Sequence, residues 1–248
     1  MLQADTLTIG MLEGYTKLPA RFNDNRIDIE LELTIDSTQT VKGDFRLDLG
    51  CGSTIILTNE TLRKLKLQGK PTADCYYSNL GVGGDGTTVD FRAASFRFLD
   101  ELYDLVISAV CNTEGALSAR PHVGIVGNSI LQHYDLIIDA PGEAVYARRN
   151  SDESTDYRRG SRTQFGYVDR TDICEGWIVS CIYDKGIAQL AGMEIGDVII
   201  SINGRPVKEI SWEEQREGLD FRGATEYLVK KSNGEIKTYV LNIDKEII

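Results

Sequence analysis

The sequence predicts a mainly β protein with two domains, and three observations lead to this prediction. Polar and apolar residues alternate over Arg26–Ile35, which is the period of a half-buried strand. Short apolar runs recur along the chain between turns that contain glycine, asparagine or proline. Residues 148–162 are polar and of mixed charge, as in a solvated linker. A chain of 248 residues can bury a core on each side of such a linker.

The elements before the linker follow from local pattern. The expected elements are an irregular lead-in with an edge strand at 6–21, strands at 26–35, 41–47, 54–57, 94–98 and 102–110, and a short helix at 58–67. Thr58 is an N-cap type of residue, and apolar positions of helical spacing follow it. Gly69 and Pro71 are expected to end this helix.

Charge and hydropathy exclude several classes of partner. The formal net charge is −11, and the lysines and arginines are scattered, so we expect no nucleic-acid binding and no attraction to an anionic membrane. No apolar run approaches the ~18 residues that span a bilayer, so we expect no membrane span. The first residues lack the basic and apolar regions of a signal peptide. We expect an exported protein, periplasmic or of the cell envelope, if a signal peptide has been removed, and a cytoplasmic one otherwise.

The residues available for chemistry are few. The five cysteines are odd in number and lack a CxxC spacing, so we expect neither a full disulfide framework nor a metal site, and no cofactor. There are two histidines, His122 and His133, and no HExxH, GxSxG or Walker A motif. His122 is expected in a loop and His133 as a packed or surface residue. A nucleophilic pair of Cys51 with a histidine stays open as an alternative to packing of this cysteine in a turn.

The segment that organises the first domain is a turn that presents Asp48. The strand at 41–47 ends immediately before Asp48, and Gly50 and Gly52 allow the backbone to turn sharply after it. The apolar run at 54–57 is then expected to return as a strand. An ordinary turn aspartate is the alternative interpretation of Asp48.

Leu47-Asp48-Leu49-Gly50-Cys51-Gly52-Ser53-Thr54-Ile55-Ile56 resembles the catalytic segment of the retropepsin-like aspartic peptidases. The resemblance implies that Asp48 is catalytic and that Leu49, Gly50, Cys51 and Ser53 form the active-site loop. Leu49 stands where the family has threonine or serine, and Cys51 where it has alanine or serine. The family's hydroxyl hydrogen-bonds across two paired catalytic loops, which leucine cannot do. Activity is therefore in doubt on the sequence alone.

A glycine-rich segment follows the catalytic strand. Gly81-Val82-Gly83-Gly84-Asp85-Gly86 satisfies GxGxxG, but a strand rather than a helix is expected after it, which excludes a dinucleotide site. The alternative is a hairpin with a glycine-rich tip. Residues Tyr76–Phe91 resemble the family's flap, which closes over bound peptide, and this assigns the flap glycines Gly81, Gly83, Gly84 and Gly86. A plain surface hairpin is the other interpretation.

A second segment resembles the same family. Ile125, Val126 and Gly127 match the family's pattern of two aliphatic residues and a glycine, followed by a short helix and a strand ending at Asp139. Gly127 is expected to let this chain pass closely beneath the catalytic loop.

The chain after the linker carries its glycines in a specific order. Residues 186–204 read Gly-Ile-Ala-Gln-Leu-Ala-Gly-Met-Glu-Ile-Gly-Asp-Val-Ile-Ile-Ser-Ile-Asn-Gly. They resemble the short helix, two turns, strand and Asn-Gly turn of the PDZ family. Gln164-Phe165-Gly166-Tyr167 resembles the carboxylate-binding loop. Ser211–Leu219 is expected to form the helix that walls a peptide groove. The expected peptide-binding residues are Phe165, Gly166, Tyr167, Val168, Trp212 and Gln215.

The expected fold is a retropepsin-like closed β-barrel lobe at 1–148, a linker at 149–162, and a PDZ-type β-sandwich with two helices at 163–248. Two functions follow from the resemblances. The first is a hydrolase, an aspartic endopeptidase that cleaves peptides or proteins. Because the chain holds one catalytic lobe, proteolysis would need a homodimer with two Asp48 residues. The PDZ domain would recruit substrate by a peptide C-terminus or an internal strand. The alternative is a weakened or inactive homologue that acts as a peptide-binding or protein-binding module.

Overall fold

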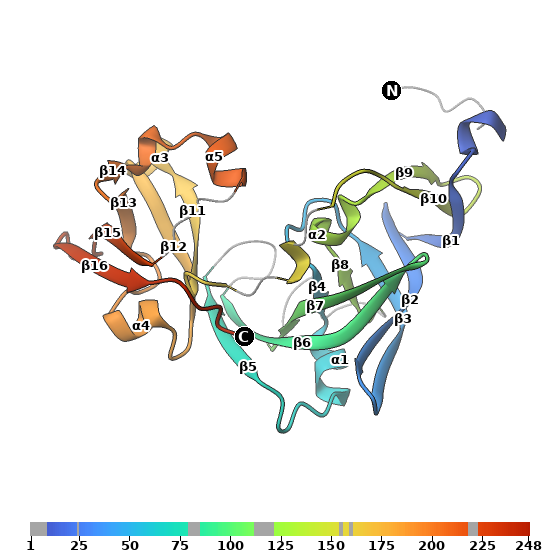
Figure 1. The fold of residues 1–248 in the computed structure, drawn as a ribbon, viewed down its shortest axis with the longest axis horizontal. Coiled ribbons are helices and arrows are strands. Elements are labelled where there is room, and N and C mark those ends of the chain that lie inside the picture. The colour runs from blue at the N-terminus through green and yellow to red at the C-terminus, as the bar shows by residue number, and fades with distance from the viewer. Residues whose placement is uncertain are drawn as a thin grey trace. The chain divides into compact units, whose positions relative to one another are not determined.

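A computed structural model describes residues 9–23, 25–78, 85–111, 122–153, 156–158, 161–217 and 223–248 (Figure 1). These residues form two compact units that are interleaved along the chain. The first unit comprises the described residues within 1–66, 92–109 and 120–158, and the second those within 67–91, 110–119 and 159–248. The domain boundaries proposed from the sequence, at 148 and 163, stay predictions.

Six strands close into a β-barrel in the described part of the chain. They are β2 (Arg26–Asp36), β3 (Gln39–Leu47), β4 (Ile55–Leu57), β6 (Gly86–Phe98), β7 (Glu101–Val110) and β8 (Gly124–Val126). Pairing runs β2–β3–β8–β4–β7–β6 and returns from β6 to β2 (Figure 1). The β3–β8 and β4–β7 pairs are parallel. The prediction of a mainly β fold with a closed barrel is confirmed.

The core of the barrel follows from the alternation in β2. Ile29, Leu33 and Ile35 are buried, and Glu30 and Glu32 between them are exposed. Each fully buried aliphatic side chain contributes about 1.5–3 kcal/mol relative to an exposed one. The alternation therefore fixes which face of β2 turns inward.

A buried ion pair joins β2 to the strand that carries Asp48. Asp28 and Arg46 lie directly opposite each other in the β2–β3 register. The Arg46 guanidinium donates to both carboxylate oxygens of Asp28, at 3.1 and 3.2 Å. Both residues are buried, so this two-point contact also satisfies polar groups that would otherwise be costly inside the barrel.

In the described part of the first unit, three more strands and four short helices accompany the barrel. They are β1 (Thr16–Asn23), β9 (Tyr134–Asp139), β10 (Ala144–Arg149), η1 (Ile9–Leu12), α1 (Asn59–Lys64), α2 (Asn128–Leu131) and η2 (Asp156–Arg158). The first half of β1 pairs with β10 and its second half with β2. Strand β10 also pairs with β9.

Helix α1 is shorter than the helix expected at 58–67. Thr58 caps it, as predicted, by accepting the Thr61 N–H at 3.2 Å. The helix ends at Lys64 because Leu65 takes an extended conformation, with φ −84° and ψ 145°. None of the helices in the described ranges is long and apolar enough to cross a membrane.

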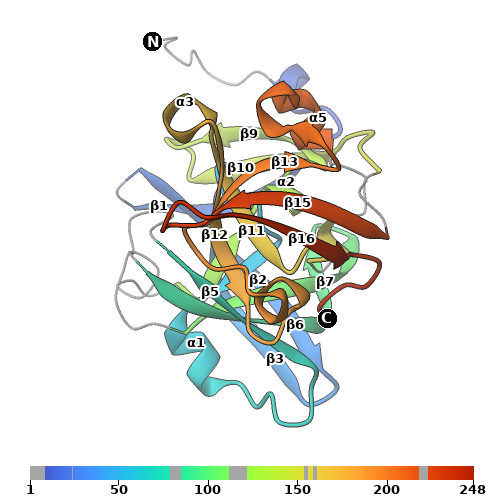
Figure 2. The same cartoon turned by 90° about the vertical axis from the view of Figure 1, so that its left-hand side faces the viewer.

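The second unit is built on a twisted sheet. Its strands are β5 (Thr72–Tyr77), the beginning of β6, β11 (Phe165–Arg170), β12 (Gly176–Tyr183), β13 (Val198–Ile202), β14 (Arg205–Pro206), β15 (Ala224–Lys230) and β16 (Ile236–Asn242). Strands β16, β15, β13 and β12 are neighbours in that order (Figure 2). The helices are α3 (Thr171–Cys174), α4 (Ile187–Ala191), η3 (Val207–Glu209) and α5 (Trp212–Glu217).

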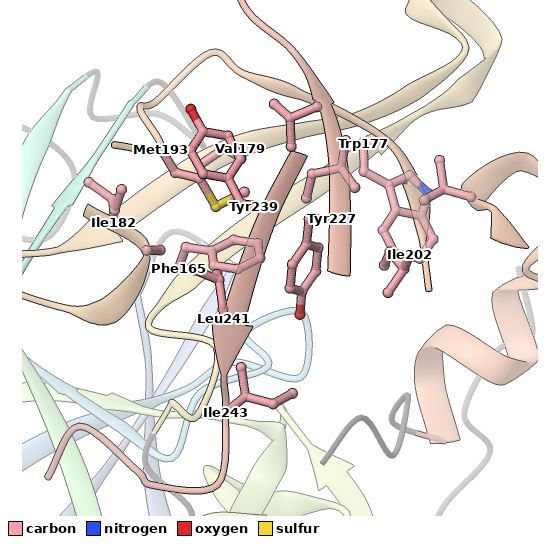
Figure 3. Close-up of a cluster of buried hydrophobic side chains, with 14 of the residues drawn as sticks. Phe165, Trp177, Val179, Ile182, Met193, Ile202, Tyr227, Tyr239, Leu241 and Ile243 are labelled. Carbon is pink, nitrogen blue, oxygen red and sulfur yellow. The ribbon is translucent and has the colours of Figure 1, made fainter. Parts of the chain in front are cut away.

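A hydrophobic core joins strands β11, β12, β13, β15 and β16 to α4 and η3 (Figure 3). Trp177 and Tyr227 are its largest fully buried side chains. The rings of Phe165 and Tyr227 meet edge to face, with centroids 5.5 Å apart. Met193, which follows α4, is buried in the same core. The core thus includes side chains from the first and last strands of the PDZ segment.

The two turns expected from the PDZ motif are explained by the structure. Gly192 ends α4 and Gly196 precedes β13, and both adopt positive φ, at 91° and 92°. Asp197 is buried, and it accepts the Glu194 N–H at 2.9 Å and the Lys231 ammonium at 2.9 Å. Glycine at these turns avoids the steric cost of a side chain in the left-handed region.

The expected flap hairpin belongs to the sheet of the second unit. Strand β5 pairs with the beginning of β6, from Thr72 opposite Phe91 to Tyr77 opposite Gly86. Strand β5 also pairs with β12, with Cys75 opposite Tyr183 and Tyr77 opposite Cys181. Strand β12 therefore carries β11 along one edge, and β13 and β5 in succession along the other.

Candidate functional site

The Asp48 loop, residues 48–54, connects β3 to β4. Asp48 is half-buried and directly follows the last residue of β3. Its Oδ1 accepts the Gly50 N–H at 3.0 Å, and its carbonyl oxygen accepts the Cys51 N–H at 3.1 Å. These bonds close a tight Asx-type turn, as an Asp-x-Gly sequence favours. Within the described ranges, Asp48 forms no ion pair, so its carboxylate is not neutralised by a neighbouring cation.

The segment beneath this loop holds it by backbone hydrogen bonds. Strand β8 pairs with β3 on one side and β4 on the other, so it contacts both ends of the loop. The Asp48 N–H donates to the Val126 carbonyl at 3.0 Å, and the Gly127 N–H donates to the Thr54 carbonyl at 2.8 Å. The Asn128 N–H then donates to the Cys51 carbonyl at 2.6 Å. The loop is thus fixed along its length.

Gly127 is the point of closest approach. A Cβ atom added there would lie 2.1 Å from the Ser53 carbonyl oxygen and 2.8 Å from that of Cys51. Ile125 and Val126 are buried beside it in β8. Only glycine fits between the two segments, which gives the physical reason for the aliphatic-aliphatic-glycine pattern.

Leu49 and Cys51, which lie close to Asp48 in the loop, differ in how far their side chains are exposed. The Leu49 side chain is 57% exposed. Cys51 is half-buried, and burial raises the pKa of its thiol, with hydrogen bonds from Ser53 opposing this and the charge of Asp48 adding to it. A thiol held protonated is a poor nucleophile, which counts against the Cys51 alternative.

The two histidines are packed inside the first unit. His133 is fully buried, stacks on Tyr103 with ring centroids 5.8 Å apart, and meets Tyr157 edge to face. Its Nδ1 lies 3.1 Å from the Asp152 carbonyl oxygen. His122 is also buried. The described residues include no group of three or more histidine, cysteine or acidic side chains that could hold a metal ion.

The flap glycines are only partly described. Gly81, Gly83 and Gly84 lie outside the described residues. Gly86 begins β6 and pairs with Tyr77 of β5. The assignment of these glycines to a flap stays a prediction.

Strand β11 and helix α5 lie together, as expected for the two walls of a peptide site. Among the described strands, β11 pairs with β12 alone, and its other edge has no strand partner. The Gln215 side chain of α5 donates to the Asp169 carboxylate of β11 at 2.9 Å. Trp212, on the first turn of α5, is 65% exposed. These residues place an open strand edge beside a helix.

The side chains expected to bind peptide take different positions. Phe165 is buried in the hydrophobic core, so it can meet a peptide only through its backbone. Tyr167 stacks on Trp177, with ring centroids 4.4 Å apart. Gly166 lies at a bulge in the β11–β12 register, and a Cβ atom there would lie 2.7 Å from the Cys181 sulfur. Val168 is half-buried farther along the strand.

Asp169 was not among the residues expected from the sequence. Burial acts to raise its pKa, but hydrogen bonds from Gln215 and Thr171 outweigh this, so the pKa lies below its ordinary value. The Thr171 N–H and hydroxyl both donate to Oδ1, at 2.9 and 2.8 Å. The local signal was the Asp-x-Thr spacing at the end of a strand, which favours such a turn.

Helix α5 is anchored at its start by a reciprocal cap. The Glu214 N–H donates to the Ser211 hydroxyl at 3.2 Å, and the Ser211 N–H donates to Glu214 Oε2 at 2.8 Å. Arg205 donates to both carboxylate oxygens of Glu214, at 2.7 and 3.0 Å. The capping serine and acidic first turn expected from the sequence are therefore present.

Comparison with known proteins gives one family match. Residues 178–214 match the family model described as PDZ domain. Among curated proteins, none matches the sequence.

Three solved structures show partial similarity. A retropepsin-like aspartic protease from Rickettsia conorii is 19% identical, with a TM-score of 0.34, over 54% of this chain and 98% of that one. The HtrA-type protease AlgW with a decapeptide is 15% identical, with a TM-score of 0.29, over 94% and 80%. Basic 7S globulin from soybean is 8% identical, with a TM-score of 0.31, over 92% and 81%. The PDZ module predicted in the second half of the chain is confirmed by the family match.

Proposed function

We propose that this protein is an aspartic endopeptidase that works as a homodimer, with one Asp48 from each copy. The observation that carries the proposal is the Asp48 loop. It presents a half-buried carboxylate on a turn held by backbone hydrogen bonds from residues 126–128. A rigid loop keeps an acid in one place, which catalysis requires.

The chemistry needs two such acids. In aspartic catalysis the two carboxylates share one proton, so that one activates water while the other polarises the scissile carbonyl. The barrel supplies one Asp48, and a twofold axis through two such loops would supply the second. Because one proton must be held by the pair, cleavage is expected on the acidic side of neutrality.

Leu49 favours the proposed dimer but is expected to lower its peptidase activity. It is 57% exposed on the rigid loop, next to Asp48. In a symmetric dimer each Leu49 can pack against its mate, which removes apolar surface from water. Leucine forms no hydrogen bond across the axis, and each lost bond is worth about 0.5–1.5 kcal/mol net. We therefore expect weak activity, lower by about one to two orders of magnitude than with threonine.

The β11–α5 pair is proposed to recruit the substrate. The β11 edge that has no strand partner can accept an extended peptide by main-chain hydrogen bonds, with α5 as the facing wall. The ligand would be a peptide C-terminus or an internal strand. Titration with such peptides should change the fluorescence of Trp212 or the NMR signals of residues 165–170. If neither changes, the module does not recruit peptides.

The second candidate is a binding protein without peptidase activity. It is favoured by Leu49 and Cys51, which replace the hydroxyl and the small residue of the resembling family. Under this alternative the peptide-binding role of the β11–α5 pair remains, and Asp48 has only the structural role of closing its turn.

A cleavage assay separates the two candidates. A peptide library is incubated with the native chain, with Asp48→Asn and with Asp100→Asn, from acid to neutral pH. Asp100 is an exposed aspartate after β6 and serves as the matched control. The endopeptidase predicts weak acid-side cleavage that Asp48→Asn abolishes and Asp100→Asn retains. No cleavage by the native chain would favour the binding protein, and cleavage that persists in Asp48→Asn would show that Asp48 is not the catalytic acid.

A further inference from the structure

Two thiols meet between neighbouring strands of the second unit. Cys75 of β5 is buried, and Cys181 of β12 is half-buried and packs against the small cluster that contains Cys75. Cys75 lies opposite Tyr183, and Cys181 lies opposite Tyr77. The two cysteines are therefore diagonal neighbours on one face of the sheet, and in the reduced structure both are free thiols.

The surroundings of the pair are specific. Ala73 and Tyr183 pack with Cys75 in a small buried cluster, against which Cys181 also packs. The Tyr183 hydroxyl donates to the buried Asp90 carboxylate at 2.5 Å. Gly166 of β11 leaves room for the Cys181 sulfur, since a Cβ atom there would lie 2.7 Å from it. The pair thus lies at the junction of β11, β12 and β5.

The two thiols are not equivalent. The interaction with the neighbouring Cys75 thiol lowers the pKa of Cys181 and outweighs the opposing effect of burial. The same interaction, together with burial, raises the pKa of Cys75. The more accessible cysteine is therefore also the one that ionises more readily, as an attacking thiol requires.

We propose that Cys75 and Cys181 form a dithiol site that a small disulfide, such as oxidised glutathione, converts to an internal disulfide. The Cys181 thiolate attacks one glutathione sulfur, forming a mixed disulfide and releasing one glutathione thiolate. Cys75 then loses its proton and attacks the Cys181 sulfur, and the second glutathione thiolate leaves. Two protein thiols are oxidised, and one glutathione disulfide is reduced to two thiols.

A disulfide between Cys75 and Cys181 would change how β5 and β12 lie against each other. Diagonal neighbours lie farther apart than directly opposed residues. A disulfide needs Cβ atoms about 3.5–4.5 Å apart, so closing it draws β5 along β12. Strand β5 pairs with the beginning of β6, and β12 pairs with β11 on its other edge. Oxidation would therefore tie the β5–β6 pair to the neighbour of the proposed peptide-binding strand.

Peptide mapping without reductant tests the proposal on the full native chain. After treatment with oxidised glutathione, the peptides containing Cys75 and Cys181 should be joined, with the loss of two hydrogens, and dithiothreitol should separate them. Amide exchange at Ser78 and Asp184 should change on oxidation, because their N–H groups donate to Ser180 and Asp74 beside the pair. Neither readout depends on peptidase activity.

Variants sharpen the assignment. Cys75→Ser should leave Cys181 as a stable mixed disulfide with glutathione, and Cys174→Ser, a half-buried control elsewhere in the unit, should leave the internal link unchanged. Glutathione found on Cys51 or Cys174 with no Cys75–Cys181 link would overturn the proposal. A link from either cysteine to a different partner would also overturn it. If a variant fails to fold, the mapping of the native chain alone decides.

Discussion

The Asp48 loop and the β11–α5 pair are held in place by different kinds of contact. The loop is fixed by backbone hydrogen bonds to residues 126–128 and by the absence of a side chain at Gly127. The β11–α5 pair is joined by a side-chain hydrogen bond between Asp169 and Gln215, and α5 itself is anchored by Ser211 and Glu214. Removing a side-chain hydrogen bond should therefore weaken the β11–α5 pair by a small amount. In the Asp48 loop, a substitution should destabilise the protein only where the new side chain would clash with the backbone.

The difference has a functional meaning. A catalytic acid must be held within a fraction of an ångström, and backbone bonds on both sides of the loop provide that rigidity. A recruiting surface can tolerate adjustment, because an added strand gains most of its affinity from main-chain hydrogen bonds. The four predictions below test this contrast, from the largest expected effect on the protein to the smallest.

The largest effect is expected from Gly127→Ala. The new Cβ would lie 2.1 Å from the Ser53 carbonyl oxygen, and both segments are bound to the barrel, so neither can move easily. Overpacking against backbone predicts a loss of about 3 kcal/mol or more in the free energy of unfolding. Chemical denaturation measures it.

Gly52→Ala is the matched control in the same loop. Nothing lies within 4 Å of a Cβ added at Gly52, so its stability should stay within about 0.5 kcal/mol of the native chain. Equal effects of the two substitutions would contradict the account of a loop fixed by close backbone approach.

A middle-sized effect is expected from Ser211→Ala at the start of α5. The substitution removes the hydroxyl that accepts the Glu214 N–H, and loss of such a cap costs about 1 kcal/mol. Urea denaturation followed by the fluorescence of Trp212 checks this. If stability is unchanged, the cap does not anchor the helix.

A similar or smaller effect is expected from Gln215→Ala. It removes the hydrogen bond to Asp169, a part-buried contact worth about 1 kcal/mol. Amide exchange should become faster in α5 and remain unchanged at Asp48 and Gly50. A change at the Asp48 loop would show that the two regions are not independent.

The smallest expected effect is a loss of α5 stability at acid pH. Hydrogen bonds from Arg205 and Ser211 lower the pKa of Glu214 from 4.5 to about 2. A carboxyl with a depressed pKa contributes stability above its unfolded value, and this is lost as pH falls from about 4.5 toward 2. Trp212 fluorescence should report loosening of α5 in that range. Glu214→Gln should remove this dependence, and Glu213→Gln, on the same turn, should retain it.

The parts of the fold that follow from local sequence could be predicted. The alternation at 26–35 gives β2, and the glycines around Asp48 give the turn. Gly127 was expected to allow close approach, and the structure shows the approach and its distance. The order of glycines at 186–204 led to the PDZ module. In each case the residue type depends on the conformation or packing of the backbone at that position, so the sequence indicates the local structure.

The contacts between distant segments could not be predicted. No local pattern shows that β5 pairs with β12, since this depends on which strand edge is left open in the folded chain. The contact between Cys75 and Cys181 depends on the same pairing. Phe165 was expected to bind peptide, but strand alternation alone did not show that its face of β11 turns into the core.

The claim that Asp48 acts in pairs is tested most directly by mixing chains. Native and Asp48→Asn chains are combined, unfolded and refolded together so that dimers form at random, and cleavage at acid pH is followed. If two native Asp48 residues are needed, activity falls with the square of the native fraction, to roughly a quarter in an equal mixture. If each chain acts alone, roughly half remains. A linear fall, or activity that Asp48→Asn leaves intact, would contradict the account.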